Sequence, residues 1–226
     1  MIVRDFFIKE MKLRYYVGVN QISLDVNQLL KKHNLTGEKE VLDYLFKVVQ
    51  ETQDNNEGSV IQFINNKYVL SLDHIFIACY YFQKAFFQKT NISNKRNIEF
   101  LLYLSTYRQI NKAIDAFGVN LHDLEKGNVI ICIISPINNI DKINNEILQV
   151  LYTYEIEITI NRVTQEKINT IIKKYEILDS QINSVMKTYN KRIIDSDDNL
   201  ETLSLAVLDL IYEKMALLNL ERGKLH

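Results

Sequence analysis

The residues best suited to chemistry in this sequence are basic, and they gather in one stretch. Between positions 84 and 112 there are six basic residues and a single acidic one, Glu99. The basic residues are Lys84, Lys89, Lys95, Arg96, Arg108 and Lys112. Because the whole chain has a net charge of −1, this stretch is a local positive stripe in a nearly neutral protein. It favours contact with an anion such as phosphate, and a solvated helix surface is an equally good explanation.

Two further features suit an unpaired nucleic acid. Lys95 and Arg96 are expected in the first turn of a helix, where free backbone N–H groups attract an anion. Aromatic residues nearby could stack on bases, and they are Phe86, Phe87, Tyr103 and Tyr107. Most of these rings are expected in the core. Tyr107, at a joint between two helices, is the candidate for stacking.

Catalytic chemistry has much weaker support. None of the four histidines pairs with cysteines or acids at zinc-ligand spacing: His33, His74, His122 and His226. Asp73, His74 and Cys79 lie on one expected helix, but the five-residue step from His74 to Cys79 does not place both on one face. Six scattered glycines form no phosphate-binding loop. We therefore expect no catalytic residue, no metal and no cofactor, and an enzyme using Asp73, His74 or Cys79 is the weakest alternative.

Most of the basic stripe lies on two consecutive helices expected within Asn91 to Asn120, while Lys84 and Lys89 come before them, at the end of a helix expected at 72–88. Ser93 is expected to cap the first helix, and a tight joint is expected at residues 105–107. Apolar residues recur at helical spacing in both helices, and those of the second are Ile110, Ala113, Ile114 and Phe117. Gly118 suits the left-handed position that ends a helix.

The rest of the chain alternates between strand and helix patterns. Strands are expected at 6–8, 15–19, 129–134 and 155–160, and a hairpin at 59–70. Helices are expected at 25–33 (with Asp25 or Ser23 as cap), 38–52, 72–88 (with Ser71 as cap), 140–153, 164–173, 179–192 and 198–220. The run Val129 to Ile134 is continuously apolar, so it is expected to be buried on both faces in the middle of a sheet. A polar linker is expected at 195–199.

Bulk properties limit the protein class. The 226 residues suit one domain, and a hydrophobic content of 47% supplies a sizeable core. Cys79 and Cys132 lie in apolar runs, as buried thiols of a reducing compartment do. The sequence has no signal peptide and no uncharged apolar run long enough to span a bilayer, so a cytoplasmic protein without a membrane partner is expected.

The stretch around the basic stripe resembles the signature of one family. The motifs are Glu99-Phe100-Leu101-Leu102-Tyr103-Leu104-Ser105, Arg108-Gln109-Ile110, Ala113-Ile114 and Phe117-Gly118-Val119. They are similar to those of the small accessory subunit of the KEOPS complex, known in animals as the PRPK-binding protein. Thr106 and Tyr107 stand where that family often has glycine. The resemblance spans most of the chain and is specific mainly between Val69 and Ile134, whereas the segment 180–199 is longer than usual for the family.

The resemblance implies both a fold and a role. The fold is α/β (α+β), a small mixed or mostly antiparallel sheet flanked by helices, in one domain with an α/β core at 1–160 and a helical part at 161–226. The role is that of a non-catalytic subunit that binds the kinase-like ATPase of KEOPS and the single-stranded CCA end of tRNA. It thereby serves, indirectly, the catalytic threonylcarbamoyl-transferase subunit. The alternative is a structural or regulatory adaptor of the kinase that never contacts RNA.

Two sets of residues are assigned on this basis. The tRNA set comprises Lys84, Lys89, Lys95, Arg96, Tyr107 and Arg108. The kinase set lies on the last helix, whose apolar stripe is wider than one packed layer needs, and comprises Leu205, Leu208 and Tyr212. Its outer residues are expected to be exposed in the isolated subunit, and ordinary burial within a three-helix layer is the alternative.

Overall fold

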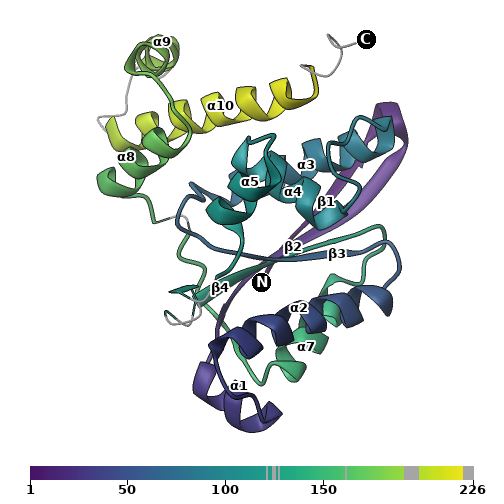
Figure 1. Cartoon of the computed structure of the whole chain (residues 1–226). Coiled ribbons are helices and arrows are strands. Elements are labelled where there is room, and N and C mark those ends of the chain that lie inside the picture. The colour runs from purple at the N-terminus through teal and green to yellow at the C-terminus, as the bar shows by residue number, and fades with distance from the viewer. Residues whose placement is uncertain (121, 124–125, 127, 161, 191–198, 221–226) are drawn as a thin grey trace. The chain divides into compact units, whose positions relative to one another are not determined.

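A computed structural model describes residues 1–120, 122–123, 126, 128–160, 162–190 and 199–220. The chain divides into two compact units (Figure 1). We call residues 1–66 and 118–159 the sheet unit, and residues 67–117 and 160–226 the helical unit. The expected boundary near residue 160 coincides with one of the crossings between the units. The helices at 72–117 belong with the C-terminal helices rather than with the sheet.

The sheet unit is built on five strands, all of them paired antiparallel. They are β1 (Ile2–Ile8), β2 (Leu13–Ser23), β3 (Val60–Ile64), β4 (Asn128–Ser135) and β5 (Tyr154–Ile156). The order is β1-β2-β4-β3, and β5 pairs with the end of β2 that β1 leaves open. The expected α/β class with a mostly antiparallel sheet is therefore confirmed.

The central position of β4 confirms the interpretation of its apolar run. β4 lies between β2 and β3, and each residue from Val129 to Ile134 is at most 1% exposed. Val129, Ile131 and Ile133 belong to the core that the sheet shares with its own helices. These residues alternate with Ile130, Cys132 and Ile134 because successive side chains of a strand point to opposite faces.

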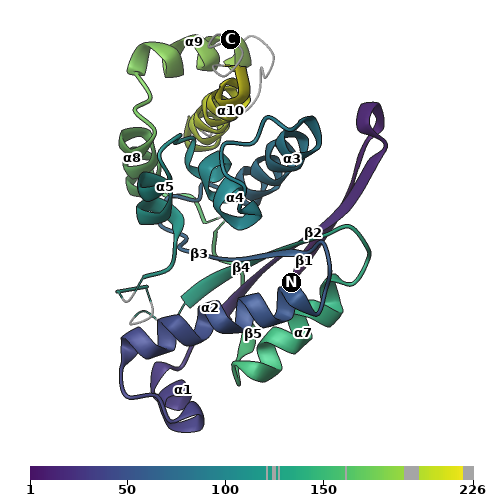
Figure 2. The ribbon, with the colours of Figure 1, turned by 45° about the vertical axis from the view of Figure 1, so that its right-hand side comes forward.

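Among its described residues, the sheet unit also contains the helices α1 (Val26–His33), α2 (Glu38–Asp54) and α7 (Ile140–Val150). Asp25 caps α1 as expected, since its Oδ1 accepts the Gln28 N–H at 2.9 Å. α2 and α7 lie side by side along one face of the sheet (Figure 2). Gly18 of β2 permits the close approach of α7, because a Cβ atom there would lie 2.3 Å from Cγ2 of Ile140.

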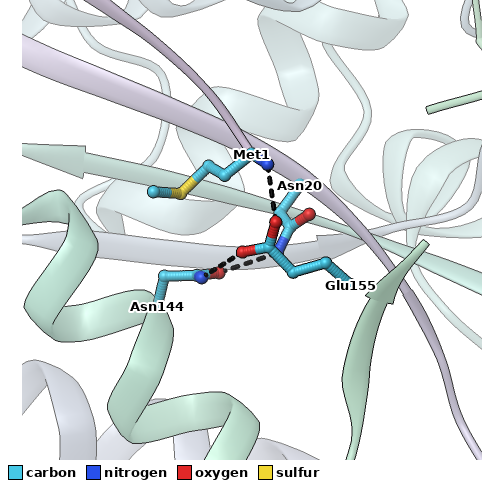
Figure 3. A network of polar contacts seen from close by, with 4 residues as sticks. All are labelled: Met1, Asn20, Asn144 and Glu155. Atoms are coloured by element: carbon cyan, nitrogen blue, oxygen red, sulfur yellow. Dashed lines mark hydrogen bonds and ion pairs between the residues drawn. The ribbon is translucent and has the colours of Figure 1, made fainter. Parts of the chain in front are cut away.

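A polar network of four residues joins Met1 to β2, α7 and β5 of this unit (Figure 3). The Met1 ammonium contacts Glu155 Oε2 of β5 at 2.7 Å, and Glu155 Oε1 accepts Asn144 Nδ2 of α7 at 2.8 Å. Asn144 Oδ1 in turn accepts Nδ2 of the fully buried Asn20 of β2 at 2.9 Å. The ammonium and amide contacts hold the pKa of Glu155 below its usual value. The network fixes the start of β1 beside β5.

In its described part, the helical unit contains α3 (Leu72–Gln88), α4 (Arg96–Ser105), α5 (Ile110–Phe117), α8 (Gln165–Lys174), α9 (Asp179–Asn190) and α10 (Asn199–Leu220). α4 packs against α3 and α5, while α10 contacts α3, α4, α8 and α9. The predicted cap Ser71 is confirmed, because its Oγ accepts the His74 N–H. Thr164, expected inside a helix rather than as its cap, caps α8, since its Oγ1 accepts the Lys167 N–H.

The expected hairpin at 59–70 is wrong. Only β3 forms, and it pairs with β4 rather than with Tyr68-Val69-Leu70. The Leu70 N–H is already used, since it donates to Nδ1 of His74 at 3.3 Å. The segment therefore leads into α3 instead of returning along β3.

Other details of the two-helix stretch also differ from expectation. α4 begins two residues later than predicted, with Lys95 at its N-cap, and Ser93 Oγ accepts the Lys95 N–H outside the helix. Gly118 forms a β-bridge with Ile64 instead of a left-handed helix end. In α5, Ala113 and Phe117 are buried as expected, whereas Ile110 and Ile114 are about 40% exposed.

Two expectations concern the membrane and the linker. Among the residues that the structure describes, no helix combines the length and the apolar character needed to cross a bilayer. Most of the predicted linker at 195–199 lies outside the described residues, as does part of the segment 180–199.

Candidate functional site

The loop between α3 and α4 is organised by the single acid of the basic stripe. Glu99 is fully buried, and its carboxylate accepts the backbone N–H groups of Ile92 (3.0 Å) and Ser93 (2.7 Å). Hydrogen bonds to a charged acceptor are stronger than neutral ones, so they fix the path of the chain just before Lys95. The acidic position of the signature thus serves to shape the loop that carries the lysines.

Arg96 is held by packing as much as by polar contacts. Its guanidinium lies over the rings of Phe82 and Phe86, at 5.5 and 5.6 Å from their centroids, and donates to Oε1 of Gln83 at 3.1 Å. Burial lowers the pKa of this side chain. Arg96 therefore ties α4 to α3, and only part of its guanidinium is left for a ligand.

The lysines of this end are more accessible. Lys89 forms the C-cap of α3 and Lys95 the N-cap of α4, and both are exposed, while Lys84 in the last turns of α3 is half-buried. We call Lys84, Lys89, Lys95 and Arg96 the α3–α4 group. The short loop between the helices keeps these basic residues at one end of the helical unit.

A second basic cluster lies at the joint between α4 and α5. Thr106 adopts a left-handed conformation (φ 58°), which turns the chain so that Tyr107 leaves the end of α4. The Lys112 and Lys174 ammonium groups lie 5.8 and 4.8 Å from the centroid of the Tyr107 ring. Lys174 also lies 5.0 Å from the ring of Tyr68, and Lys67 lies 5.1 Å from that same ring. Two tyrosines thereby hold three ammonium groups close together, since a ring face attracts a cation.

The same joint gives Arg108 a structural role. Its Nη1 donates to the carbonyl oxygen of Leu218 at 3.1 Å, in the last turn of α10. A cation at this end of a helix is favourable, because carbonyl groups there lack partners within the helix. Arg108, Lys214 and Leu217 also line a small cavity of about 300 Å³. We call Tyr68, Tyr107, Arg108, Lys67, Lys112 and Lys174 the α4–α5 group.

The structure thus separates the six residues assigned to tRNA into two groups. α4 has ten residues and is about 15 Å long, so its two ends cannot form a single small site. The α4–α5 group includes Tyr68 and Lys174, which the sequence analysis missed. Their separation of more than a hundred positions left no sequence signal, because only the fold brings α8 against the joint.

The buried polar centre of the helical unit explains His74. His74 is fully buried, with Nδ1 facing the Leu70 N–H at 3.3 Å and Nε2 facing the Leu104 carbonyl at 3.0 Å. The Tyr175 hydroxyl donates to the same carbonyl at 2.6 Å. Burial lowers the pKa of His74 to about 4, and the positive charge of Lys167 acts in the same direction. These contacts assign the ring proton to Nε2 and make His74 a neutral connector of α3, α4 and the end of α8.

Nothing in this centre resembles a catalytic site. His74 and Cys79 are both 0% exposed, so neither can reach a substrate. Burial lowers the pKa of Lys167 to about 8, but its ammonium donates to the Ile160 carbonyl at 2.7 Å. Within the described part of the chain, His, Cys, Asp and Glu side chains form no group of three that could hold a metal ion.

The residues assigned to the kinase differ in exposure. Leu205 of α10 is 39% exposed and Tyr212 is half-buried, but Leu208 is only 7% exposed. Leu208 is therefore a core residue of the isolated chain, contrary to the expected outer edge of the stripe. Apolar side chains of α8, α9 and α10 also line an open hollow of about 460 Å³, including Ile172, Ile182 and Leu203.

Comparison with known proteins identifies the family to which the chain belongs. A family model described as "Kinase binding protein CGI-121" matches residues 24–219, which is most of the chain. A search of curated proteins finds no match. The match confirms the resemblance seen in the basic stripe. The members of this family are non-catalytic kinase-binding subunits. The family match therefore also confirms the expectation that the chain is not an enzyme.

Proposed function

Because the chain belongs to the CGI-121 kinase-binding protein family, we propose that it binds the kinase-like ATPase of a KEOPS complex and the CCA end of tRNA. In this role the chain recruits substrate for the threonylcarbamoyl-transferase subunit and performs no chemistry itself. The family match carries the kinase part of the proposal. The two groups of basic residues at the ends of α4 carry the tRNA part.

The physical properties of these groups fit a single-stranded tail. Such a tail needs a few phosphate contacts and a ring or two, so one local basic surface on a neutral protein is enough. In the α3–α4 group, Lys89 and Lys95 extend from a loop that Glu99 fixes. In the α4–α5 group, Lys112 and Lys174 lie over Tyr107, so a base could stack there only by displacing an ammonium group. We therefore assign phosphate contacts, rather than stacking, to Lys112 and Lys174 of the α4–α5 group.

Binding of tRNA with and without its CCA end tests the proposal. We expect tight binding of the full tRNA and at least tenfold weaker binding of the truncated one. The double variants Lys89→Ala/Lys95→Ala and Lys112→Ala/Lys174→Ala then test the two groups separately. Each lost single-strand phosphate contact lowers the slope of log affinity against log salt by about 0.7.

The matched control is Lys31→Ala/Lys39→Ala, which removes two exposed lysines of the sheet unit. It should leave both affinity and salt slope unchanged. Equal binding of the two tRNAs would contradict the role in holding the CCA end. Absence of any tRNA binding, with kinase binding intact, would establish the alternative of a purely structural adaptor.

The kinase surface is tested on α10. Leu205 and Tyr212 are seven residues apart and therefore lie on one face of the helix, on which Leu205 is exposed. A charge at Leu205 should weaken kinase binding at least tenfold, since burying a leucine contributes about 1.5–3 kcal/mol and 1.4 kcal/mol is a factor of ten.

Leu208→Glu is the informative comparison, because Leu208 is buried in the isolated chain. It should lower thermal stability strongly, whereas Leu205→Glu should leave the fold intact. Unchanged kinase affinity in a folded Leu205→Glu protein would place the partner surface elsewhere.

A further inference from the structure

The strand β1 forms an unusually open edge of the sheet. Its seven residues pair with β2 on one side only, and Ile2, Val3 and Phe7 are 38%, 41% and 53% exposed. The opposite edge strand, β3, is shorter and has four of its five residues buried. Edge strands present a row of free backbone groups, and natural sheets usually shorten or cover them. The long apolar edge at β1 is therefore suited to pairing with another strand.

The hairpin of β1 and β2 also extends beyond the rest of the sheet (Figure 2). β4 pairs with β2 only from Tyr16 onward, so the part of β2 before Tyr16 is paired with β1 alone. At the other end, the Met1 contact with Glu155 holds the start of β1 in line with the sheet. β1 is thus fixed at one end and accessible along its outer side. The family match begins at residue 24, so it assigns no role to this hairpin.

The side chains of β1 are complementary to a second copy of β1. When two such strands pair antiparallel with Asp5 opposite Asp5, all seven residues find a partner. In that arrangement Val3 lies opposite Phe7 of the second copy, and Ile2 lies opposite Ile8. Directly opposed apolar side chains stabilise a strand pair, whereas opposed like charges destabilise it. A shift of two residues to the register centred on Arg4 would place Val3 opposite Asp5 and pair only five residues.

Arg14 compensates the negative charge of Asp5 at the centre of this arrangement. Its Nε lies 3.6 Å from Oδ1 of Asp5 within the same chain, and its guanidinium lies 5.8 Å from the ring of Phe7. Two copies therefore bring together two carboxylates and two guanidinium groups, on a face where Val3 and Phe7 flank them. The charges balance, and the apolar contacts on either side exclude water.

We propose that β1 is the contact strand of a homodimer, in which two copies join their sheets edge to edge with Asp5 opposite Asp5. Two five-stranded sheets then form one continuous ten-stranded sheet. This inference is independent of the tRNA and kinase assignments.

Engineered cysteines test the register in the full-length chain. Asp5→Cys should form a disulfide with itself across the dimer under mild oxidation. Val3→Cys and Phe7→Cys should not cross-link alone but should do so when mixed, because each faces the other. Residues 3 and 3 of the two copies would lie about 13 Å apart along the strands, beyond the roughly 7 Å between Cα atoms that a disulfide spans. The native Cys79 and Cys132 are at most 1% exposed, so the parent protein is the uncross-linked control.

Light scattering on a sizing column tests the association itself. The parent protein should have twice its chain mass of 26.6 kDa at high concentration. Phe7→Lys should shift the protein to the monomer, because charges on an edge strand oppose pairing. Phe46→Lys is the matched control, since Phe46 on α2 is 51% exposed and should have no effect.

Each contrary outcome overturns the proposal. A parent protein that stays monomeric at every concentration has no such dimer, even if β1 pairs with a strand of another protein. A dimer that survives Phe7→Lys, or that dissociates equally with Phe46→Lys, uses another surface. Cross-linking of Val3→Cys alone, without cross-linking of Asp5→Cys, would exclude the register.

Discussion

Lowering the pH should weaken the helical unit through one residue, His74. In the folded chain burial lowers its pKa to about 4, from an ordinary value of 6.5. The unfolded state therefore binds the proton more tightly than the folded state. The stability that His74 contributes is fully present above pH 6.5 and is lost as the pH falls toward 4.

The size of the effect follows from the difference in pKa. Each pKa unit corresponds to 1.36 kcal/mol, so a difference of roughly 2.5 units amounts to about 3 kcal/mol in total. Between pH 7 and pH 5 the loss is about 2 kcal/mol, because most of the difference is expressed once the pH is well below 6.5. This is a large fraction of the stability of an ordinary domain.

Urea unfolding at pH 7, 6 and 5 measures this loss, with His74→Gln as the reference. Glutamine is neutral and can accept or donate one hydrogen bond, so the variant should be less stable at pH 7 but should lose less on acidification. Subtracting the two pH profiles removes the carboxylates, among them Glu40 and Glu155, whose pKa values their hydrogen bonds lower. The pKa of His74 itself can be followed by NMR of the imidazole nitrogens.

Two results would refute this reasoning. The first is a His74 pKa above about 6 in the folded protein, which would mean that the ring accommodates a proton despite its burial. The second is an identical pH dependence for the parent and His74→Gln, which would assign the acid sensitivity to other groups. Tyr175→Phe is a further control variant. It removes the hydroxyl near His74 without adding a group that titrates in this pH range.

Three further substitutions test other contacts. Glu99→Ala should lower the free energy of unfolding in urea by about 2–3 kcal/mol, because it leaves the N–H groups of Ile92 and Ser93 without their acceptor. Glu99→Gln should lower it less. A decrease below about 0.5 kcal/mol for Glu99→Ala would contradict this role. Gly18→Ala should destabilise the fold by about 1–3 kcal/mol, because its added Cβ would overpack against Ile140. Gly37→Ala is the control: no atom lies within 4 Å of its added Cβ, so stability should change by less than about 0.5 kcal/mol. Equal effects of the two substitutions would exclude a steric cause. Arg108→Ala should lower thermal stability through the lost contact with Leu218; unchanged stability with weaker tRNA binding would instead assign Arg108 to RNA.

Local signals in the sequence predicted local structure well. Asp25 and Ser71 cap the helices that follow them, as predicted, because a short polar side chain needs only its own backbone neighbours to act. The apolar run from Val129 to Ile134 likewise predicted a central strand. The family signature in the basic stripe predicted the fold class, because a resemblance to a family indicates the fold of the whole chain rather than the type of one element.

Tertiary contacts limited the remaining predictions. Tyr68-Val69-Leu70 has the composition of a strand, but the Leu70 N–H is taken by His74 and the hairpin does not form. The basic stripe reads as one surface, yet α4 separates its two ends, and Lys174 joins one of them from a distant helix. Leu208 belongs to an apolar stripe whose outer edge only the packing of α10 could locate. His74 lies only four residues from Leu70, whereas Lys174 lies on a helix distant in sequence from the basic stripe.

The discontinuous make-up of the sheet unit has a consequence for synthesis of the chain. β2 emerges from the ribosome early, but its inner partner β4 follows much later, since Ser23 pairs with Asn128 and Tyr16 with Ser135, at separations of 105 and 119 residues. At about 5–20 residues per second, the first hairpin waits roughly 5–25 s for this partner. During that time Val17, Val19 and Ile22 have no β4 to cover them, although all are fully buried in the finished fold. A chain that stops before residue 128 keeps that edge of β2 open for good, so such truncations are expected to aggregate instead of folding.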